Sequence, residues 1–217
     1  MHLKYKINFF RAYKAFKKLR KNPTNTIFVM ETMHETQAPS LKRVYNKLLQ
    51  TSSGGEIAYN LEEISSYFAT LKDRPEGSVG KECHNLFPNQ EILLKVSRRK
   101  NKGNNWIEAK HPYNWIARRY RDTHDTWHTL TGYPANDIGE MCLAMFSFAQ
   151  TTSLGWLLAS FAIFLKHGVT KRNVMLMMGA YQHGKQAKFL LAENYDEIFS
   201  ENLEAARVRL NINAQTL

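Results

Sequence analysis

The sequence predicts an all-α protein, for three reasons. Apolar residues recur at i, i+3 and i+4 through most of the 217 residues, which is the period of a helix face. Residue types that begin and end helices separate these stretches. No alternation of strand and helix patterns and no internal repeat interrupts them. A chain of this length suits one hydrophobic core, so we expect a single domain over residues 1–217.

The first expected helix is the basic N-terminal segment 1–21, which contains eight Lys or Arg residues and no Asp or Glu. Within it Phe9, Tyr13 and Phe16 fall at helical spacing, so the helix is amphipathic. Such a helix suits an anionic membrane surface, although simple packing as the first helix of the fold also explains the pattern. The rest of the chain is near neutral and carries no nucleic-acid motif, so we expect no nucleic-acid partner.

Further helices are placed by apolar spacing and by flanking start and stop residues. A capping box formed by Asn60 and Glu63 marks the start of the expected helix 61–71. The expected helices are 26–35, 40–49, 61–71, 113–131, 137–151, 153–167, 171–192 and a closing stretch that ends near Leu210. The charged run 98–105 is expected to be a loop.

Three missing features exclude particular structures and sites: a membrane-spanning run, a CxxC pair and a P-loop. The apolar run 154–165 is much shorter than the roughly 20 residues that a membrane-spanning helix needs, so we predict a buried helix there. Cys83 and Cys142 are the only cysteines and form no CxxC pair, which excludes a disulfide framework and a thiolate zinc site. The glycine-containing stretch 77–81 lacks the spacing of a phosphate-binding P-loop and suits a turn followed by a helix cap.

The most informative stretch places two imidazoles on one expected helix. His124 and His128 are four residues apart, so on a helix they share one face. Asp125 lies about 100° around the helix axis from His124 and can point into the same cleft. A solvated polar helix face would show the same spacing, and both interpretations stay open on spacing alone.

A second carboxylate follows on the next helix. Gly132 suits the left-handed residue that ends a helix, and Pro134 prevents its immediate continuation. Asn136 or Asp137 then caps a helix that carries Glu140 near its start. We therefore expect the motif to lie on two adjacent antiparallel helices. Two imidazoles with two carboxylates suit Zn²⁺, Fe²⁺ or Mn²⁺, and Mg²⁺ less well, with room for water or substrate.

The segment Arg119-Tyr-Arg-x-x-His-Asp-x-x-His-x-x-x-Gly-x-Pro-x-x-x-x-Gly-Glu140 resembles the Coq4 family of ubiquinone-biosynthesis proteins. The turn Pro75-Glu-Gly-Ser-Val-Gly-Lys81 and the C-terminal stretches 180–187 and 207–212 are also similar to that family, so the resemblance covers most of the chain. Phe148-Ala-Gln-Thr151 is similar to the family's bacterial branch. After Glu140 the chain departs from the eukaryotic pattern, which leaves the substrate open.

The resemblance implies a metal-dependent carboxy-lyase that removes the C1 carboxylate of a polyprenylated hydroxybenzoate, with an oxidative course as a variant. One divalent metal, most readily zinc, would be held by His124, Asp125, His128 and Glu140. Glu140 and Arg121 would be catalytic. Arg118 and Arg119 would contribute to substrate binding, and Trp156 and Phe161 would line an apolar groove for the prenyl tail.

The resemblance also implies partners and a location. The expected partners are an isoprenoid lipid, a membrane surface, other quinone-biosynthesis proteins and a second copy in a homodimer. We expect a bacterial protein to be cytoplasmic and peripheral to the membrane, and a eukaryotic one to lie on the matrix side of the inner mitochondrial membrane. A non-catalytic lipid carrier, or a scaffold for the biosynthetic enzymes, remains the alternative function.

Overall fold

The computed structural model describes residues 7–89 and 111–215, and the expected loop 98–105 lies outside them. By its contacts the chain divides into two compact units. Unit 1 comprises Met1–Val44, Tyr133–Ala187 and Gln215–Leu217, whereas unit 2 comprises Tyr45–Gly132 and Lys188–Ala214. The single domain over residues 1–217 stays a prediction.

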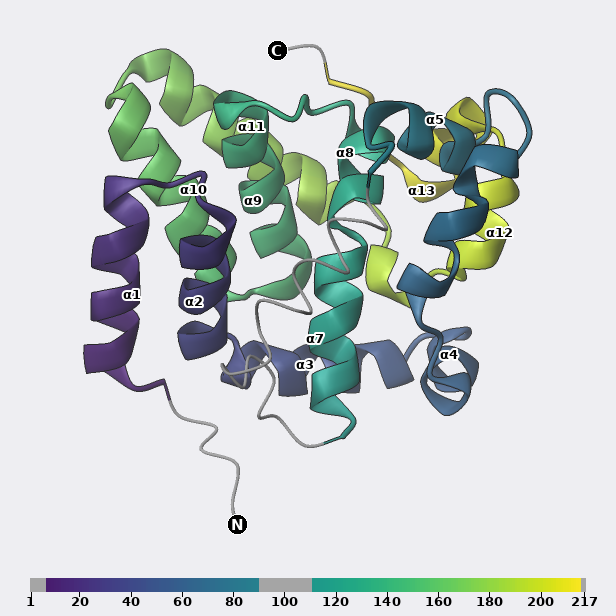
Figure 1. Ribbon diagram of the computed structural model, residues 1–217, viewed down its shortest axis with the longest axis horizontal. Helices are drawn as coiled ribbons and strands as arrows, with labels where there is room; N and C mark the ends of the chain where they lie inside the picture. Colours follow the sequence, from purple (N-terminus) through teal and green to yellow (C-terminus); the bar gives the residue numbers. More distant parts are fainter. Residues whose placement is uncertain (1–6, 90–110, 216–217) are drawn as a thin grey trace. The chain divides into compact units, whose positions relative to one another are not determined.

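The all-α class is confirmed (Figure 1). The described residues form no β-strand, although an isolated β-bridge joins Ser78 to Asn202. None of the helices in these residues is long and apolar enough to cross a membrane. The helices of unit 1 are α1 (Phe9–Lys21), α2 (Thr26–Thr36), α9 (Asp137–Thr151), α10 (Leu154–His167) and α11 (Lys171–Gln186). Those of unit 2 are α4 (Gly54–Asn60), η1 (Ile64–Ser66), η2 (Phe68–Asp73), α5 (Val79–Leu86), α7 (Tyr113–Asp122), α8 (His124–Thr131), η3 (Leu190–Ala192), α12 (Tyr195–Ser200) and α13 (Leu203–Leu210). The helix α3 (Ala38–Leu49) contributes to both units.

Unit 1 is a helical bundle in which α9 packs against both α10 and α11, while α1 and α2 pack against each other and against α10. Small residues allow the close approaches. A Cβ atom added at Gly184 of α11 would lie 2.5 Å from the carbonyl oxygen of Phe146 in α9. The Gln150 side chain donates a 2.7 Å hydrogen bond to the Gly184 carbonyl, and Ser160 donates one of 2.8 Å to the Met141 carbonyl. These bonds pair buried polar groups and hold α9 against its two neighbours.

Unit 2 is built around α5, which packs against η2, α8, α12 and α13. Ser78 caps α5 by accepting a hydrogen bond from the Lys81 backbone N–H, and Gly77 takes a positive φ of 72° before it. The predicted turn and cap in the stretch 77–81 are therefore confirmed. The helix α7 packs against η1 and continues into α8.

A buried arginine ties α7 to the rest of unit 2. Arg119 has a fully buried side chain that pairs with Glu62 at 2.7 Å. Its other nitrogens donate to the carbonyl oxygens of Leu191 and Glu193 at 2.8 and 2.6 Å. Glu62 also accepts a hydrogen bond from the Tyr195 backbone N–H. A buried charge pair is tolerated when its remaining donors and acceptors are satisfied, and here they are.

Three of the expected helices differ in the structure. Segment 113–131 is split at Thr123, whose hydroxyl donates to the Arg119 carbonyl at 3.0 Å. The prediction for 61–71 is wrong, because Asn60 is the last residue of α4 and Leu61 adopts a left-handed conformation with a φ of 49°. Two short 3₁₀ segments, η1 and η2, follow in place of an α-helix.

The apolar face of the first helix also differs from the sequence pattern. The residues Phe9 and Tyr13 of the predicted stripe are exposed, and Phe16 is half-buried. The buried side of α1 is made of Ala12, Ala15 and Leu19. The last part of the expected helix 171–192 is instead an irregular stretch followed by η3, since α11 ends at Gln186.

The close approach of α9 and α11 generates a stability prediction. Gly184→Ala should lower the free energy of unfolding by about 1–3 kcal/mol, because the added methyl group meets backbone atoms of α9. Gly179→Ala, on the same helix with open space around it, should be neutral or stabilising by up to about 1 kcal/mol. Urea unfolding monitored by circular dichroism measures both, and equal effects of the two variants would contradict the packing argument.

The buried arginine generates a second stability prediction. Arg119→Ala should cost about 3–5 kcal/mol of unfolding free energy, because the Glu62 carboxylate, only 10% exposed, loses its charged partner. Arg118→Ala is the matched control, because the pair of Arg118 with Glu63 is partly exposed and its loss should cost less than about 1 kcal/mol. Adding Glu62→Gln to Arg119→Ala should recover part of the loss. A small effect of Arg119→Ala alone would contradict this account.

Candidate metal centre

The helix α8 presents two imidazoles on one face. The ring centroids of His124 and His128 lie 4.8 Å apart with their planes perpendicular. Phe87, just beyond the end of α5, packs against His128 at a centroid distance of 5.6 Å. His128 is buried and His124 is half-buried. The predicted shared face of the two histidines is confirmed.

Other parts of unit 2 hold α8 in place from its remaining sides. Trp127 donates a 2.7 Å hydrogen bond to the hydroxyl of Tyr195 in α12. Arg207 of α13 donates to the carbonyl oxygens of Leu130 and Thr129, both at 2.9 Å. A cation at these carbonyls satisfies groups that a helix C-terminus leaves unpaired and favours the helix dipole. The rotation of α8 about its axis is therefore determined by contacts that do not involve the histidines.

The turn after α8 follows the sequence prediction. Gly132 ends the helix in a left-handed conformation with a φ of 75°. Asn136 caps α9 by accepting a 2.9 Å hydrogen bond from the Gly139 backbone N–H. Glu140 consequently lies in the first turn of α9, where a carboxylate is favoured by the helix dipole.

Three residues offer one metal-ligand atom each, namely His124, His128 and Glu140, and they could hold a metal ion. The two histidines belong to unit 2, and Glu140 belongs to unit 1. Two imidazoles and one carboxylate are a donor set that zinc, iron and manganese accept, and three protein ligands leave a coordination position open. The residues present fit the metal that the sequence predicted. The antiparallel arrangement of the two helices stays a prediction.

Asp125 is not one of these three residues. It lies in the first turn of α8 and is half-buried, and its backbone carbonyl accepts a 3.2 Å hydrogen bond from the Thr129 hydroxyl. On the helix it stands about 100° from His124, whereas His128 shares the His124 face. The role of Asp125 as a fourth ligand stays a prediction.

The three predicted arginines differ in what their side chains contact. Arg118 pairs with Glu63, and Arg119 is enclosed by the structural contacts described above. Arg121 donates a 2.6 Å hydrogen bond from Nε to Asp122. One terminal nitrogen of Arg121, buried and with no hydrogen-bond partner in the described residues, remains as a donor. Of the three, Arg121 best retains the capacity to bind a further carboxylate.

Asp122 is not among the residues predicted for the site. Its carboxylate is buried beside Arg121, two residues before His124. The adjacency of Arg121 and Asp122 directly before the histidine motif was the signal that could have drawn notice. A buried carboxylate on this arginine fixes the position of the guanidinium group.

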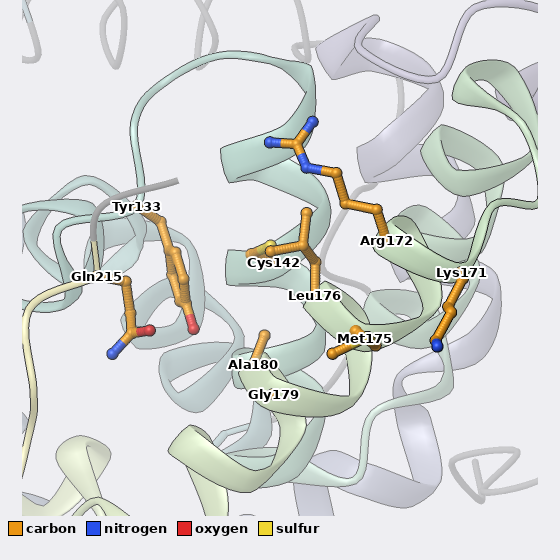
Figure 2. A pocket seen from close by; sticks show the side chains of 9 residues that line it. All are labelled: Tyr133, Cys142, Lys171, Arg172, Met175, Leu176, Gly179, Ala180 and Gln215. Atoms are coloured by element: carbon orange, nitrogen blue, oxygen red, sulfur yellow. The ribbon is translucent and has the colours of Figure 1, made fainter.

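Unit 1 contains a mostly apolar cavity of about 550 Å³ (Figure 2). Tyr133 and Gln215 lie on one side of it, and Lys171 and Arg172 at the start of α11 lie on the other. Between them the wall is formed by Cys142, Met175, Leu176, Gly179 and Ala180. The predicted groove residues are elsewhere, since Trp156 packs against the core of unit 1 and Phe161 is partly exposed on α10. Their role in substrate binding stays a prediction.

The wall of this cavity carries no charge near neutral pH apart from its two basic residues. Burial raises the pKa of the Cys142 thiol to about 12 and raises the pKa of Tyr133 well above its usual range. Tyr133 and His183 share a 3.1 Å hydrogen bond, and burial lowers the pKa of His183 below 6.5. The cavity therefore suits an apolar group that ends in an anion.

The chain matches a known protein family and several of its members. The family model described as coenzyme Q (ubiquinone) biosynthesis protein Coq4 matches residues 7–216. The mitochondrial ubiquinone biosynthesis protein COQ4 homolog of Homo sapiens is 26% identical over 199 residues, covering 89% of this chain and 73% of that protein. The mitochondrial COQ4 protein of Komagataella phaffii is 26% identical over 206 residues, and the match covers 88% of this chain but only 64% of the relative.

A solved structure has the same fold. The crystal structure of a protein from Nostoc punctiforme, assigned to ubiquinone biosynthesis, superimposes with a TM-score of 0.69. The match covers 96% of this chain and 100% of the other at 17% sequence identity. At that identity the similarity shows the shared fold and no more.

The histidine pair generates a metal-binding prediction. The purified, untagged protein should carry about one equivalent of a divalent metal, and His128→Ala should lose most of it, because three protein ligands are then reduced to two. His167→Ala is the control, since this half-exposed histidine pairs with Asp137 on the surface of unit 1. Inductively coupled plasma mass spectrometry measures the content. A folded wild-type protein that takes up no zinc, iron or manganese would contradict the assignment.

Proposed function

Because the chain belongs to the Coq4 family, we propose that it acts in ubiquinone biosynthesis as a metal-dependent decarboxylase of a polyprenylated hydroxybenzoate at a membrane surface. The observation that carries this proposal is the pair of imidazoles on α8 followed by Glu140 in the first turn of α9. Two histidines and one carboxylate leave a coordination position for a substrate oxygen, which is the pattern of a catalytic site.

Each residue of the site would have a distinct role. His124, His128 and Glu140 would hold the ion, with Asp125 as the proposed fourth ligand. When bound, a divalent metal supplies Lewis-acid stabilisation of the charge that develops as carbon dioxide leaves. Arg121 would orient the substrate carboxylate through its remaining guanidinium donor, while Asp122 keeps that guanidinium in place.

The cavity of unit 1 supports an isoprenoid lipid as the ligand. Apart from Lys171 and Arg172 its wall is mostly apolar, and Met175 is a pliable lining for a flexible chain. Lys171 and Arg172 at its edge offer charge to an anionic end group. We propose that this cavity, rather than a groove on Trp156 and Phe161, takes part of the prenyl tail.

The proposal predicts the loss of turnover in one variant. Glu140→Ala should reduce decarboxylation of a prenylated hydroxybenzoate by about 100-fold or more, because metal stabilisation of the transition state contributes several kcal/mol. Asp137→Asn, in the same helical turn, should remain active because Asp137 forms a surface ion pair with Lys166. Release of labelled carbon dioxide measures turnover, and circular dichroism checks that each variant is folded.

Two outcomes would redirect the proposal. Wild-type activity in Glu140→Ala would remove the metal from the reaction. A wild-type protein that co-purifies with a prenyl lipid but never releases carbon dioxide would indicate a lipid carrier or a scaffold for other biosynthetic enzymes.

A further inference from the structure

The helix α1 exposes aromatic side chains although it is packed within unit 1. Its buried face of small and branched residues, described above, rests against α2 and α10. On its outer side Phe9, Phe10 and Tyr13 are 79%, 66% and 63% exposed. Large apolar side chains that gather on a surface mark an interaction site rather than a structural need. Core packing within the described residues therefore does not explain these three aromatics.

The apolar surface continues from α1 onto α10. Phe16 stacks on Phe161 with ring centroids 6.5 Å apart, and Figure 1 shows the two helices side by side. Phe161 and Leu165 are themselves 41% and 37% exposed. We call this surface the aromatic strip, and its members are Phe9, Tyr13, Phe16, Phe161 and Leu165.

A cationic depression lies at the end of the strip. It has a volume of about 380 Å³ and is lined by Arg20, Lys21, Pro23, Leu165 and Lys166. Lys166 pairs with Asp137, but neither Arg20 nor Lys21 has an ion-pair partner within the residues that the structure describes. Leu165 belongs to both features, so the depression and the strip are continuous.

The charge around this surface is strongly positive. The described part of the basic N-terminal segment, residues 7–21, contains six Lys or Arg residues and no acidic residue. The acidic Glu31 of α2 pairs with Lys18 of α1, which neutralises a single one of these cations. An excess of positive charge beside exposed aromatics matches an anionic bilayer, in which apolar side chains enter the interface and cations contact phosphates.

We propose that the aromatic strip and the cationic depression form one membrane-binding face that docks on anionic phospholipids, with a lipid phosphate in the depression. This proposal rests on the proposed function, because that function requires the protein to work at a membrane surface. The face itself is assembled from α1 and α10 and includes no metal ligand.

Two other occupants fit the surface less well. A second copy of the chain would bring two strongly positive helices together, and like charges repel. A single-stranded nucleic acid needs free ring faces for base stacking. The rings of Phe16 and Phe161 already pack on each other with an interplanar angle of 17°, and the Lys14 ammonium lies over the Phe10 ring at 4.3 Å, so these ring faces are not all open to bases.

Vesicle co-sedimentation of the full-length protein tests the proposal. The protein should bind vesicles of phosphatidylcholine with phosphatidylglycerol and bind poorly to phosphatidylcholine alone. The double variant Phe9→Ser with Tyr13→Ser should weaken binding at least tenfold, which is about 1.4 kcal/mol. Its control is Tyr59→Ser with Val208→Ser, which removes two even more exposed apolar side chains from unit 2.

A charge variant tests the depression separately. Arg20→Gln with Lys21→Gln should weaken binding to the anionic vesicles about tenfold or more and reduce its dependence on salt. The control is Lys185→Gln with Lys188→Gln, which removes the same charge from exposed positions elsewhere. Equal loss in test and control variants would overturn a localised face in favour of general charge attraction.

Further outcomes would also overturn the proposal. These are equal binding of the wild type to neutral vesicles, no binding to either vesicle, and a dimer in light scattering that Phe9→Ser with Tyr13→Ser dissociates. A fourth is tighter binding to a single-stranded oligonucleotide that the same variant abolishes. His128→Ala separates this face from the proposed function, because it should bind vesicles like the wild type while lacking metal. A wild-type protein that binds vesicles fully but shows no turnover would contradict the proposed decarboxylase activity and leave the membrane-binding face supported.

Discussion

The buried guanidinium of Arg119 is the interaction on which the metal-binding helix depends. It joins α7 to Glu62 and to the backbone of Leu191 and Glu193, so one side chain connects three segments of unit 2. The helix α7 runs into α8 with only Thr123 between them, and the Thr123 hydroxyl bonds to the Arg119 carbonyl. The position of Arg119 therefore helps to fix where the helix that carries His124 begins.

The position of the short helix α8 is fixed by contacts on the sides that carry no metal ligand. Trp127 bonds to Tyr195, and Arg207 bonds to the last carbonyls of the helix. An isolated helix of this length has little stability of its own, so its conformation comes from these tertiary contacts. The histidine face is thus prepared by packing and not by the metal. A ligand set held in this way loses little conformational entropy when it binds an ion.

Local signals predicted much of this architecture. Gly132 and Asn136 end and begin helices as their residue types require, and the four-residue spacing of the histidines placed both rings on one face. The prediction for 61–71 failed because the capping-box pattern does not reveal that Leu61 turns left-handed after α4. The burial of Arg119 was equally inaccessible, since Glu62 lies 57 residues away in the sequence. An Arg-rich run gives no sign of which guanidinium is structural.

The proposed membrane face and Glu140 are linked through a single turn of α9. Lys166 lines the cationic depression and also pairs with Asp137, which lies three residues before Glu140. Hydrogen bonds from Lys166 and His167 hold the pKa of Asp137 below its usual value, so the Asp137 carboxylate stays ionised at neutral pH. Because α9 also accepts the Ser160 hydrogen bond at Met141, the first turn of α9 is fastened to α10 at two points. A phosphate that binds in the depression would share Lys166 with Asp137, while the Ser160 bond keeps the turn that presents Glu140 on α10 even when the Asp137 pair is weakened.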